Sequence, residues 1–316
     1  MTVGIRLVLG PAAYQAGMDA PTGHEEEDCW SRWLGQGRDG GDAAMRARME
    51  AETAAYAARV LGFVPAPPGE MLDIGSGDGL MGWAALSRWP DVFVTMTDIS
   101  PALLAQARAK AARLGVAAQC RFVRAGAETL GGIADASQDV VTSRSALAYV
   151  ADKPAAFRAA YRVLRPGGIM AIAEPLFREE ALSACLLREA AAQTADPLLA
   201  LLYKWKAAQF PGTRDAMEAS PLANYTEREL LGFAKQAGFR GAHLELHIDE
   251  REVPPRGWEA FCAASPHPLA PCLADILARD FSRAEREIFE AAIRPGIEAG
   301  QFGTASRMVY LYAHKP

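Results

Sequence analysis

The stretch Leu72-Asp73-Ile74-Gly75-Ser76-Gly77-Asp78-Gly79 decides the fold. An apolar run ends in an acidic residue and then turns through three glycines, which predicts a strand, a tight turn and a helix. The glycines let a ligand lie directly on the backbone, and the start of the helix offers free N–H groups. In dinucleotide-binding dehydrogenases the third glycine comes one residue later, and the turn faces a pyrophosphate. Here Asp73 stands just ahead of the turn, where it would repel a pyrophosphate and attract a cationic group.

A second carboxylate follows at the end of the next predicted strand, residues 93–99. Asp98 comes about 25 residues after Asp73, where a carboxylate can accept hydrogen bonds from both hydroxyls of a ribose. The two acids and the glycine turn together predict a nucleoside-containing ligand at the carboxyl edge of a parallel sheet.

Short apolar runs alternate with helical segments on both sides of this stretch, which is typical of βαβ units. The helix after Asp98 begins at Ser100-Pro101 and stops at Gly115. The predicted strands are residues 71–75, 93–99, 120–125, 139–144, 168–175, 243–252 and 306–314. We therefore expect an α/β fold with a Rossmann-like sheet of seven strands, six of them parallel and the last antiparallel.

The remaining segments predict the domain organisation. We expect residues 1–68 to form an N-terminal tail, irregular over residues 1–22, followed by cap helices, one of them capped by Asp42. The Pro-rich residues 65–69 end this part. Residues 69–316 would form the main domain. Helical, aromatic-rich insertions at residues 176–220 and 254–304 interrupt the alternation, and we expect them to form a lid over the carboxyl edge of the sheet.

Composition limits the partners. The 316 residues include 33 Lys and Arg against 38 Asp and Glu, a net charge of -5, and the basic residues are scattered. Nucleic-acid-binding proteins carry a basic stripe, so we expect a small-molecule substrate and no nucleic-acid partner. No apolar run approaches the length of a membrane span, so no membrane partner is expected. A homodimer is compatible with the sequence.

Cysteine usage indicates the compartment. The five cysteines are odd in number, far apart and without a Cys-x-x-Cys pair, which predicts reduced thiols. The first 13 residues lack the basic start and strong apolar run of a signal peptide. We therefore expect a cytoplasmic protein.

Three motifs carry a family resemblance. LDIGSGDG (72–79), TDIS (97–100) and YRVLRPGG (161–168) resemble those of class I methyltransferases that depend on S-adenosylmethionine (SAM), close to the menaquinone/ubiquinone C-methyltransferase and arsenite-methyltransferase-like group. The resemblance covers about residues 69–175 and 225–238. It implies SAM as the cofactor and says almost nothing about the acceptor.

The resemblance also implies roles for individual residues. Asp73 and Gly75 would face the methionine part of SAM, Asp98 would bind the ribose, and Ile99 would pack on the adenine. The other implied cofactor contacts are Ser76, Gly77 and Gly79 in the turn, Ala127 and Glu128 near the adenine, Ser143 through its backbone, and Arg38 near the SAM carboxylate. The family often has Asp at the position of Gly126, so an adenine hydrogen bond is missing here.

Methyl transfer from a sulfonium chiefly requires alignment of the nucleophile and exclusion of water. A general base is needed only for an acceptor whose proton has a high pKa. The candidate catalytic residues are Tyr149 after the fourth strand, Glu174 at the end of the fifth, and His267 in the second insertion. The leading hypothesis is methyl transfer to a small, hydrophobic or aromatic metabolite through an oxygen, carbon or nitrogen atom.

Two alternatives use the same motifs. One is a SAM-binding protein without transferase activity, such as a cyclase or a ligand sensor. The other is methylation of arsenite or a thiol, because cysteines occur in both insertions. His243 and His247 share one face of a predicted strand, but without a third ligand they make a weak metal site, and we expect none.

Overall fold

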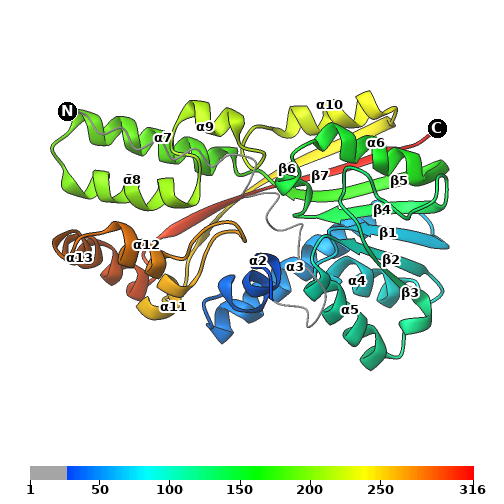
Figure 1. The fold of residues 1–316 in the computed structure, drawn as a ribbon, viewed down its shortest axis with the longest axis horizontal. Helices are drawn as coiled ribbons and strands as arrows, with labels where there is room; N and C mark the ends of the chain where they lie inside the picture. The colour runs from blue at the N-terminus through cyan, green and yellow to red at the C-terminus, as the bar shows by residue number, and fades with distance from the viewer. Residues whose placement is uncertain (1–26) are drawn as a thin grey trace.

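The structure is a computed structural model that describes residues 27–316 (Figure 1). Its sheet has seven strands in the order β3-β2-β1-β4-β5-β7-β6. β7 is antiparallel to both of its neighbours, and the pairs among β1 to β5 are parallel. The strands are β1 (Glu70–Ile74), β2 (Phe93–Asp98), β3 (Cys120–Arg124), β4 (Gln138–Arg144), β5 (Leu164–Pro175), β6 (Arg240–Glu252) and β7 (Gly303–His314). The predicted seven-stranded sheet with one antiparallel strand is confirmed.

Helices cover both faces of the sheet. One face packs against α3 (Ala43–Gly62), α4 (Leu80–Arg88) and α5 (Pro101–Leu114), and the other packs against α6 (Lys153–Val163) and α10 (Glu227–Ala237). Figure 1 shows α6 and α10 on one side of the strands and α3, α4 and α5 on the other. A short 3-10 turn, η2 (Ala117–Gln119), leads into β3. Each face thus has its own apolar core.

Local capping explains where these helices begin and end. The Asp42 side chain accepts hydrogen bonds from two backbone N–H groups at the start of α3, and Ser100 caps α5 in the same way. Gly115 ends α5 with φ of +73°. One boundary was predicted wrongly. The fifth strand was expected over residues 168–175, but β5 already begins at Leu164, with a register shift opposite β4.

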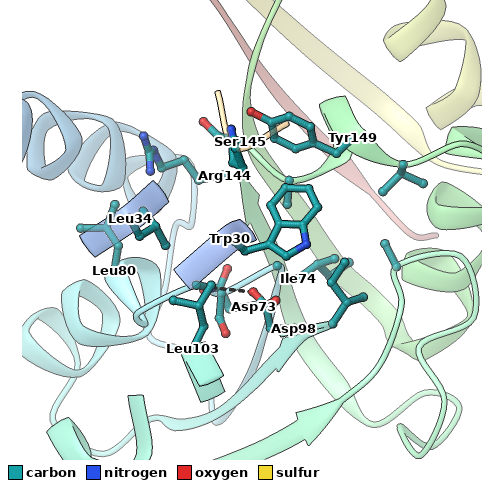
Figure 2. A pocket seen from close by; sticks show the side chains of 18 of the residues that line it. Trp30, Leu34, Asp73, Ile74, Leu80, Asp98, Leu103, Arg144, Ser145 and Tyr149 are labelled. Carbon is teal, nitrogen blue, oxygen red and sulfur yellow. Dashed lines mark hydrogen bonds between the residues drawn. The ribbon is translucent and has the colours of Figure 1, made fainter. Parts of the chain in front are cut away.

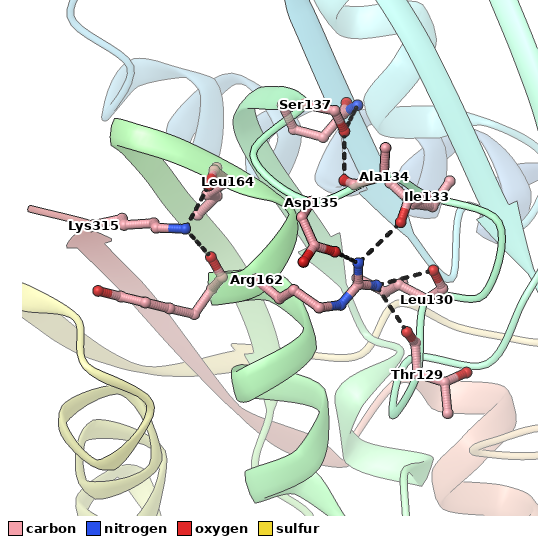
Figure 3. A network of polar contacts seen from close by, with 11 residues as sticks. Thr129, Leu130, Ile133, Ala134, Asp135, Ser137, Arg162, Leu164 and Lys315 are labelled. Carbon is pink, nitrogen blue, oxygen red and sulfur yellow. Dashed lines mark hydrogen bonds and ion pairs between the residues drawn. The ribbon is translucent and has the colours of Figure 1, made fainter.

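The loop between β3 and β4 is held by a network of polar contacts from α6 (Figure 3). Arg162 donates hydrogen bonds to the carbonyl oxygens of Thr129, Leu130 and Ile133 at 3.0–3.3 Å and forms an ion pair with Asp135. Four partners for one guanidinium fix a loop that has little regular structure of its own. This loop begins with residues that line the cavity described below.

The insertions are helical, as predicted, and they share one core. The first contains α7 (Arg178–Gln193), α8 (Pro197–Gln209) and α9 (Arg214–Ala219); the second contains α11 (Trp258–Ala263), α12 (Leu273–Asp280) and α13 (Arg283–Ala299). Leu201 of the first packs with Ile276 and Phe289 of the second in an apolar cluster separate from the sheet. Figure 1 shows both sets together beyond the end of the sheet. They are one helical body made from two stretches of chain.

The N-terminal segment contacts this body directly. It contains α2 (Cys29–Arg32) and a π-helical turn, η1 (Trp33–Gly37). The Trp33 indole N–H donates to the Ser265 carbonyl oxygen at 3.0 Å, and the Ser265 N–H donates to the Gly37 carbonyl oxygen at 2.8 Å. The cap before the sheet and the second insertion are therefore joined. The expected irregular tail over residues 1–22, and the expectation that residues 1–13 are not a signal peptide, fall outside the described residues.

Within residues 27–316, none of the helices combines the length and the apolar character that crossing a bilayer requires.

Candidate functional site

A cavity of about 280 Å³ lies at the carboxyl ends of β1, β2 and β4, below the N-terminal cap (Figure 2). Nine of the predicted site residues line it: Asp73, Gly75, Ser76, Gly77, Asp98, Ile99, Ala127, Glu128 and Tyr149. The structure therefore gathers residues from four separate segments around one space. The other five, Arg38, Gly79, Ser143, Glu174 and His267, are not among its lining residues.

Asp73 is buried at the end of β1, and only one of its two carboxylate oxygens accepts a hydrogen bond from the described residues. Its Oδ1 accepts a hydrogen bond of 3.0 Å from the Thr142 hydroxyl, whereas its Oδ2 is buried and has no hydrogen-bond partner among residues 27–316. Burial raises the pKa of Asp73 to about 8, despite the Thr142 hydrogen bond. An unpaired buried carboxylate oxygen is costly. A cationic N–H donor from a ligand would satisfy it.

The glycine turn brings the backbone close to the cavity. Gly75 has φ of +63°, and a Cβ there would collide with the side chain of Ala146, so only glycine fits without strain. The Ser76 N–H donates to the Thr97 carbonyl oxygen at 2.9 Å, which ties the turn to β2. The Ser76 hydroxyl is buried with no hydrogen-bond partner in the described part of the chain, and Ser76 lines the cavity. The turn thus offers a second unsatisfied polar group to a ligand.

Asp98 is fixed more firmly than Asp73. Its Oδ2 accepts from the Gly77 N–H at 2.8 Å and its Oδ1 from the Ser100 N–H at 2.9 Å. Burial raises the pKa of Asp98, and these backbone donors oppose the rise. An ionised carboxylate has about four lone-pair sites, so each oxygen retains capacity for a ligand hydroxyl. Ile99, Ala125 and Ala127 continue the lining as an apolar surface.

The opposite side of the cavity is aromatic. Trp30 and Tyr149 meet edge to face with ring centroids 5.1 Å apart, and Phe177 lies 6.3 Å from Tyr149. Pro266 and Pro268 of the second insertion also line this side. Figure 2 shows Trp30 between Tyr149 and the two carboxylates of the site. The cavity thus has a polar half formed by the ends of the strands. Its apolar half is formed by the N-terminal cap, the loop after β4 and the insertions.

Tyr149 lines the cavity as predicted, but its chemistry is restricted. Burial raises the pKa of Tyr149 well above its ordinary value, and the neighbouring charge of Glu174 raises it further. The phenol therefore stays protonated at neutral pH. It can donate a hydrogen bond or pack against a ligand, but it is not a base.

Glu174 occupies a different position from the one expected for a proton-transfer group. It is fully buried, and its carboxylate accepts hydrogen bonds from the Ser143 hydroxyl and the Ala146 and Ala148 N–H groups at 3.0–3.3 Å. Burial raises the pKa of Glu174, and these donors oppose the rise. Its partners belong to the end of β4 and to the loop after it, which includes η3 (Leu147–Tyr149). The geometry gives Glu174 and Ser143 a bracing role beneath Tyr149 and no direct contact with the cavity.

His267 likewise has both ring nitrogens engaged. Nε2 lies 2.8 Å from the Gln209 carbonyl oxygen, to which it must donate, and Nδ1 accepts from the Leu269 N–H at 3.3 Å. Burial lowers the pKa of His267 to about 4, so the ring is neutral. Neither nitrogen is available as a base. His267 instead joins the end of α8 to the loop of the second insertion.

Arg38, which was predicted to lie near the SAM carboxylate, is not among the lining residues. A second arginine in this region was not predicted. Arg144 ends β4 and lines the cavity. Both side chains have a buried Nε to which no other described residue is hydrogen-bonded. The signal that could have revealed Arg144 is a basic residue at the carboxyl end of a buried parallel strand. Leu103 and Met308 also line the cavity and were not predicted to do so.

Thiols and metal ligands do not converge here. None of the lining residues is a cysteine, which removes the support for the arsenite alternative. His243 and His247 do share a face of β6, where both contact Glu245, at 3.3 and 3.0 Å. Among residues 27–316, no three His, Cys, Asp or Glu side chains are grouped as a metal site would require.

Comparison with known proteins identifies the central segment. Residues 72–172 match the family described as "Methyltransferase domain". The ubiquinone/menaquinone biosynthesis C-methyltransferase of Klebsiella pneumoniae is 37% identical over 81 residues, 26% of this chain and 32% of that protein. The malonyl-[acyl-carrier protein] O-methyltransferase of Xylella fastidiosa is 34% identical over 103 residues, 33% of this chain and 34% of that one. The chain thus spans about a third of the length of these relatives.

Solved structures extend the likeness in fold beyond this segment. A Bacillus halodurans C-125 protein superimposes with a TM-score of 0.52 at 18% identity, over 83% of this chain and 99% of that chain. The YcgJ protein of Bacillus subtilis gives 0.53 at 17% identity, over 84% and 98%. From its methyltransferase domain and its sheet, this chain belongs to the superfamily of class I SAM-dependent methyltransferases, for which SAM is the cofactor.

Proposed function

We propose that the chain transfers the methyl group of SAM to a small, hydrophobic or aromatic metabolite. The observation that carries the cofactor assignment is the unpaired Oδ2 of Asp73 beside the glycine turn. A buried carboxylate oxygen that lacks a hydrogen-bond donor suits an ammonium group, such as the one in the methionine part of SAM. The residues present therefore fit the cofactor.

The remaining contacts follow from this placement. Asp98 would accept hydrogen bonds from the ribose, because each of its oxygens already has one backbone donor and retains capacity for another. Ile99 and Ala127 would pack on the adenine. SAM supplies an activated methyl group on a sulfonium. The protein's own contribution is to align the acceptor with that group and to keep water out.

The aromatic half of the cavity supports the acceptor class. Trp30, Tyr149 and Phe177 offer flat apolar surfaces, which suit a planar or hydrophobic molecule. Trp30 of the N-terminal cap and Pro266 and Pro268 of the second insertion also line this side of the cavity, which favours a small acceptor over a protein segment. Of the three candidate bases, none is both free and ionised, so an acceptor that is acidic or already nucleophilic is favoured.

We further propose the domain division at residue 69, with the two insertions as the lid of residues 69–316. All five cysteines are free thiols, which fits a reducing compartment such as the cytoplasm.

The test is to incubate the protein with SAM and a metabolite extract and to measure S-adenosylhomocysteine by mass spectrometry. Asp98→Ala removes two hydrogen bonds to a charged acceptor, each worth about 1.5–3 kcal/mol, so SAM affinity should fall at least tenfold by calorimetry. Asp91→Asn, an exposed acid ahead of β2, should bind SAM like the wild type.

Each half of the proposal can fail separately. Unchanged SAM affinity in Asp98→Ala would refute the placement of the cofactor. SAM binding without any S-adenosylhomocysteine above the level of a protein-free control would instead favour the non-transferase alternative.

A further inference from the structure

β6 is the last strand of the sheet and pairs with β7 along one of its sides (Figure 1). In the part of the chain that the structure describes, no strand pairs with its other side. Such an edge presents a row of backbone N–H and C=O groups that a further strand can bind, and proteins usually protect it with proline, lysine or a short strand. The regular part of β6 begins at His243, after a register shift. Residues 243–249, which we call the β6 edge, contain neither proline nor lysine.

Two apolar side chains of the β6 edge face solvent. Leu246 is 40% exposed and Ile248 is 58% exposed. They alternate with Leu244, which packs against the core of the sheet, so all three share one face of the strand. Leu246 lies opposite Val309 of β7, which is fully buried. The apolar face of the sheet thus continues past the core to its outermost strand, where a partner could bury it.

The β6 edge is complementary to its own sequence. It reads His-Leu-Glu-Leu-His-Ile-Asp. In an antiparallel pair of two copies centred on Leu246, three kinds of pair flank the centre: His243 with Asp249, Leu244 with Ile248, and Glu245 with His247. Each polar pair joins an imidazole to a carboxylate, which can accept a hydrogen bond from a neutral or a charged histidine. The apolar pairs all lie on the opposite face.

Neighbouring registers lack this complementarity. A shift of two residues places Glu245 opposite either Glu245 or Asp249 of the second copy, and like charges directly opposite one another are destabilising. A shift of one residue sends the apolar side chains of the two copies to opposite faces. The pairing centred on Leu246 therefore agrees with both the charge pattern and the apolar pattern of the strand.

We propose that the β6 edge binds the β6 edge of a second copy of the chain across a two-fold axis at Leu246. The contact uses the same surface on both copies, so it closes as a dimer, and the sheet runs through both. None of the residues that line the cavity belongs to β6. Each copy therefore keeps its own cavity, and the proposal does not depend on the proposed function.

Sedimentation velocity over a range of concentrations tests the dimer. Ile248→Lys places an ammonium group among apolar side chains at the contact, so the Kd of the dimer should rise at least tenfold. Ile248 is exposed in the single chain, so the Tm measured at a concentration where the wild type is monomeric should not change. Ile288→Lys alters another exposed apolar residue, on α13, and should dimerise like the wild type. A wild type that is monomeric throughout, or a dimer that Ile248→Lys does not weaken, would overturn the proposal.

Disulfide formation tests the register separately. In Leu246→Cys the two new thiols lie directly opposite one another, within reach of a disulfide, and mild oxidation should give a covalent dimer. In Ile248→Cys each thiol lies four positions from its counterpart, about 13 Å along the strands, which is too far to bridge. The wild type controls for the five native cysteines. No link in Leu246→Cys, or an equal yield in Ile248→Cys, would refute this pairing.

Discussion

The two acidic residues of the cavity, Asp73 and Asp98, differ in how many hydrogen bonds the protein donates to their carboxylates. Asp98 has a backbone donor on each oxygen, whereas Asp73 has one oxygen with no partner. The first is a preformed acceptor held by the turn and by the cap of α5. The second has a pKa raised to about 8 by burial. A cationic ligand beside Asp73 would therefore lower the pKa of this residue and favour its ionised form.

This difference predicts how stability changes with pH. The ligand-free fold binds the Asp73 proton up to about pH 8, whereas an unfolded chain releases it near pH 3.9. Between these values the folded state holds more protons, so this residue lowers the free energy of unfolding as pH rises. Asp73→Asn does not titrate. Its stability relative to the wild type, measured by urea denaturation without ligand, should increase from pH 5 to pH 8. The same difference at both pH values would contradict the raised pKa.

We expect Tyr149 and His267 to contribute less to turnover than a general acid or base does. The phenol is held protonated, and both nitrogens of the imidazole are engaged. We expect Tyr149→Phe and His267→Ala to lower turnover about tenfold or less, since general acid–base catalysis contributes about 10²–10⁴. The measurement is kcat with an accepted substrate. A loss beyond about a thousandfold in either variant, with SAM binding intact, would show a general base that this arrangement does not explain.

Sequence alone predicted the residues whose roles are local. Asp73, the glycines and Asp98 belong to short motifs, because a strand, a turn and a helix start place them. Arg144 was missed, since its place in the cavity wall depends on packing against distant segments, such as the ring of Tyr56. His267 was proposed as a base because a lone histidine shows neither its burial nor its partners. Those come from Gln209, 58 residues away in the chain.

At the level of elements, the loop after β4 is braced from two sides. Glu174 of β5 accepts from two N–H groups of this loop and from the Ser143 hydroxyl at the end of β4. The buried Lys153 donates to the Ala148 and Val150 carbonyl oxygens at 3.3 and 3.0 Å. Lys153 also donates to the Pro221 carbonyl oxygen at 2.6 Å, so the same amine ties the loop to the end of the first insertion. Tyr149 is therefore positioned by contacts on both sides of its loop.

Glu174→Gln tests this brace. The amide loses one of the two acceptor oxygens and leaves buried N–H or hydroxyl groups without partners, at a cost of about 1–3 kcal/mol. We expect a lower free energy of unfolding together with a reduced kcat, because Tyr149 loses its fixed position. The exposed Glu287→Gln on α13 should change stability by less than about 0.5 kcal/mol. Wild-type stability in Glu174→Gln would show that the loop does not depend on this carboxylate.

The strands and cap residues were predictable because periodicity and capping are local properties. The shared core of the insertions was not. Leu201 and Phe289 are far apart in the sequence, and each insertion alone looks like an ordinary amphipathic segment. Only the pairing of α8 with α12 and α13 shows that the two stretches bury one another.

At the scale of the whole molecule, three connected parts cover the cavity: the N-terminal cap and the two insertions. Trp33 joins the N-terminal cap to Ser265 of the second insertion, and His267 joins that insertion to Gln209 of the first. The shared core makes the two insertions one unit. If the cavity opens for ligands, the parts should therefore move together.

Hydrogen exchange tests this coupling. Without ligand, α8 and α11 to α13 should exchange faster than the strands and at rates similar to one another, because they form one unit outside the sheet. SAM and an acceptor together should slow exchange in all of them. Protection in these helices that does not change with ligand would indicate a fixed cap. Slowing in only one insertion would contradict their movement as a unit.

The most direct test of the central claim is a crystal structure with S-adenosylhomocysteine bound. We expect the ribose hydroxyls on the Asp98 carboxylate, the adenine against Ile99 and Ala127, and the ammonium group on Asp73 Oδ2. A ligand bound elsewhere, or in the cavity with its amino-acid end at Asp98, would contradict it.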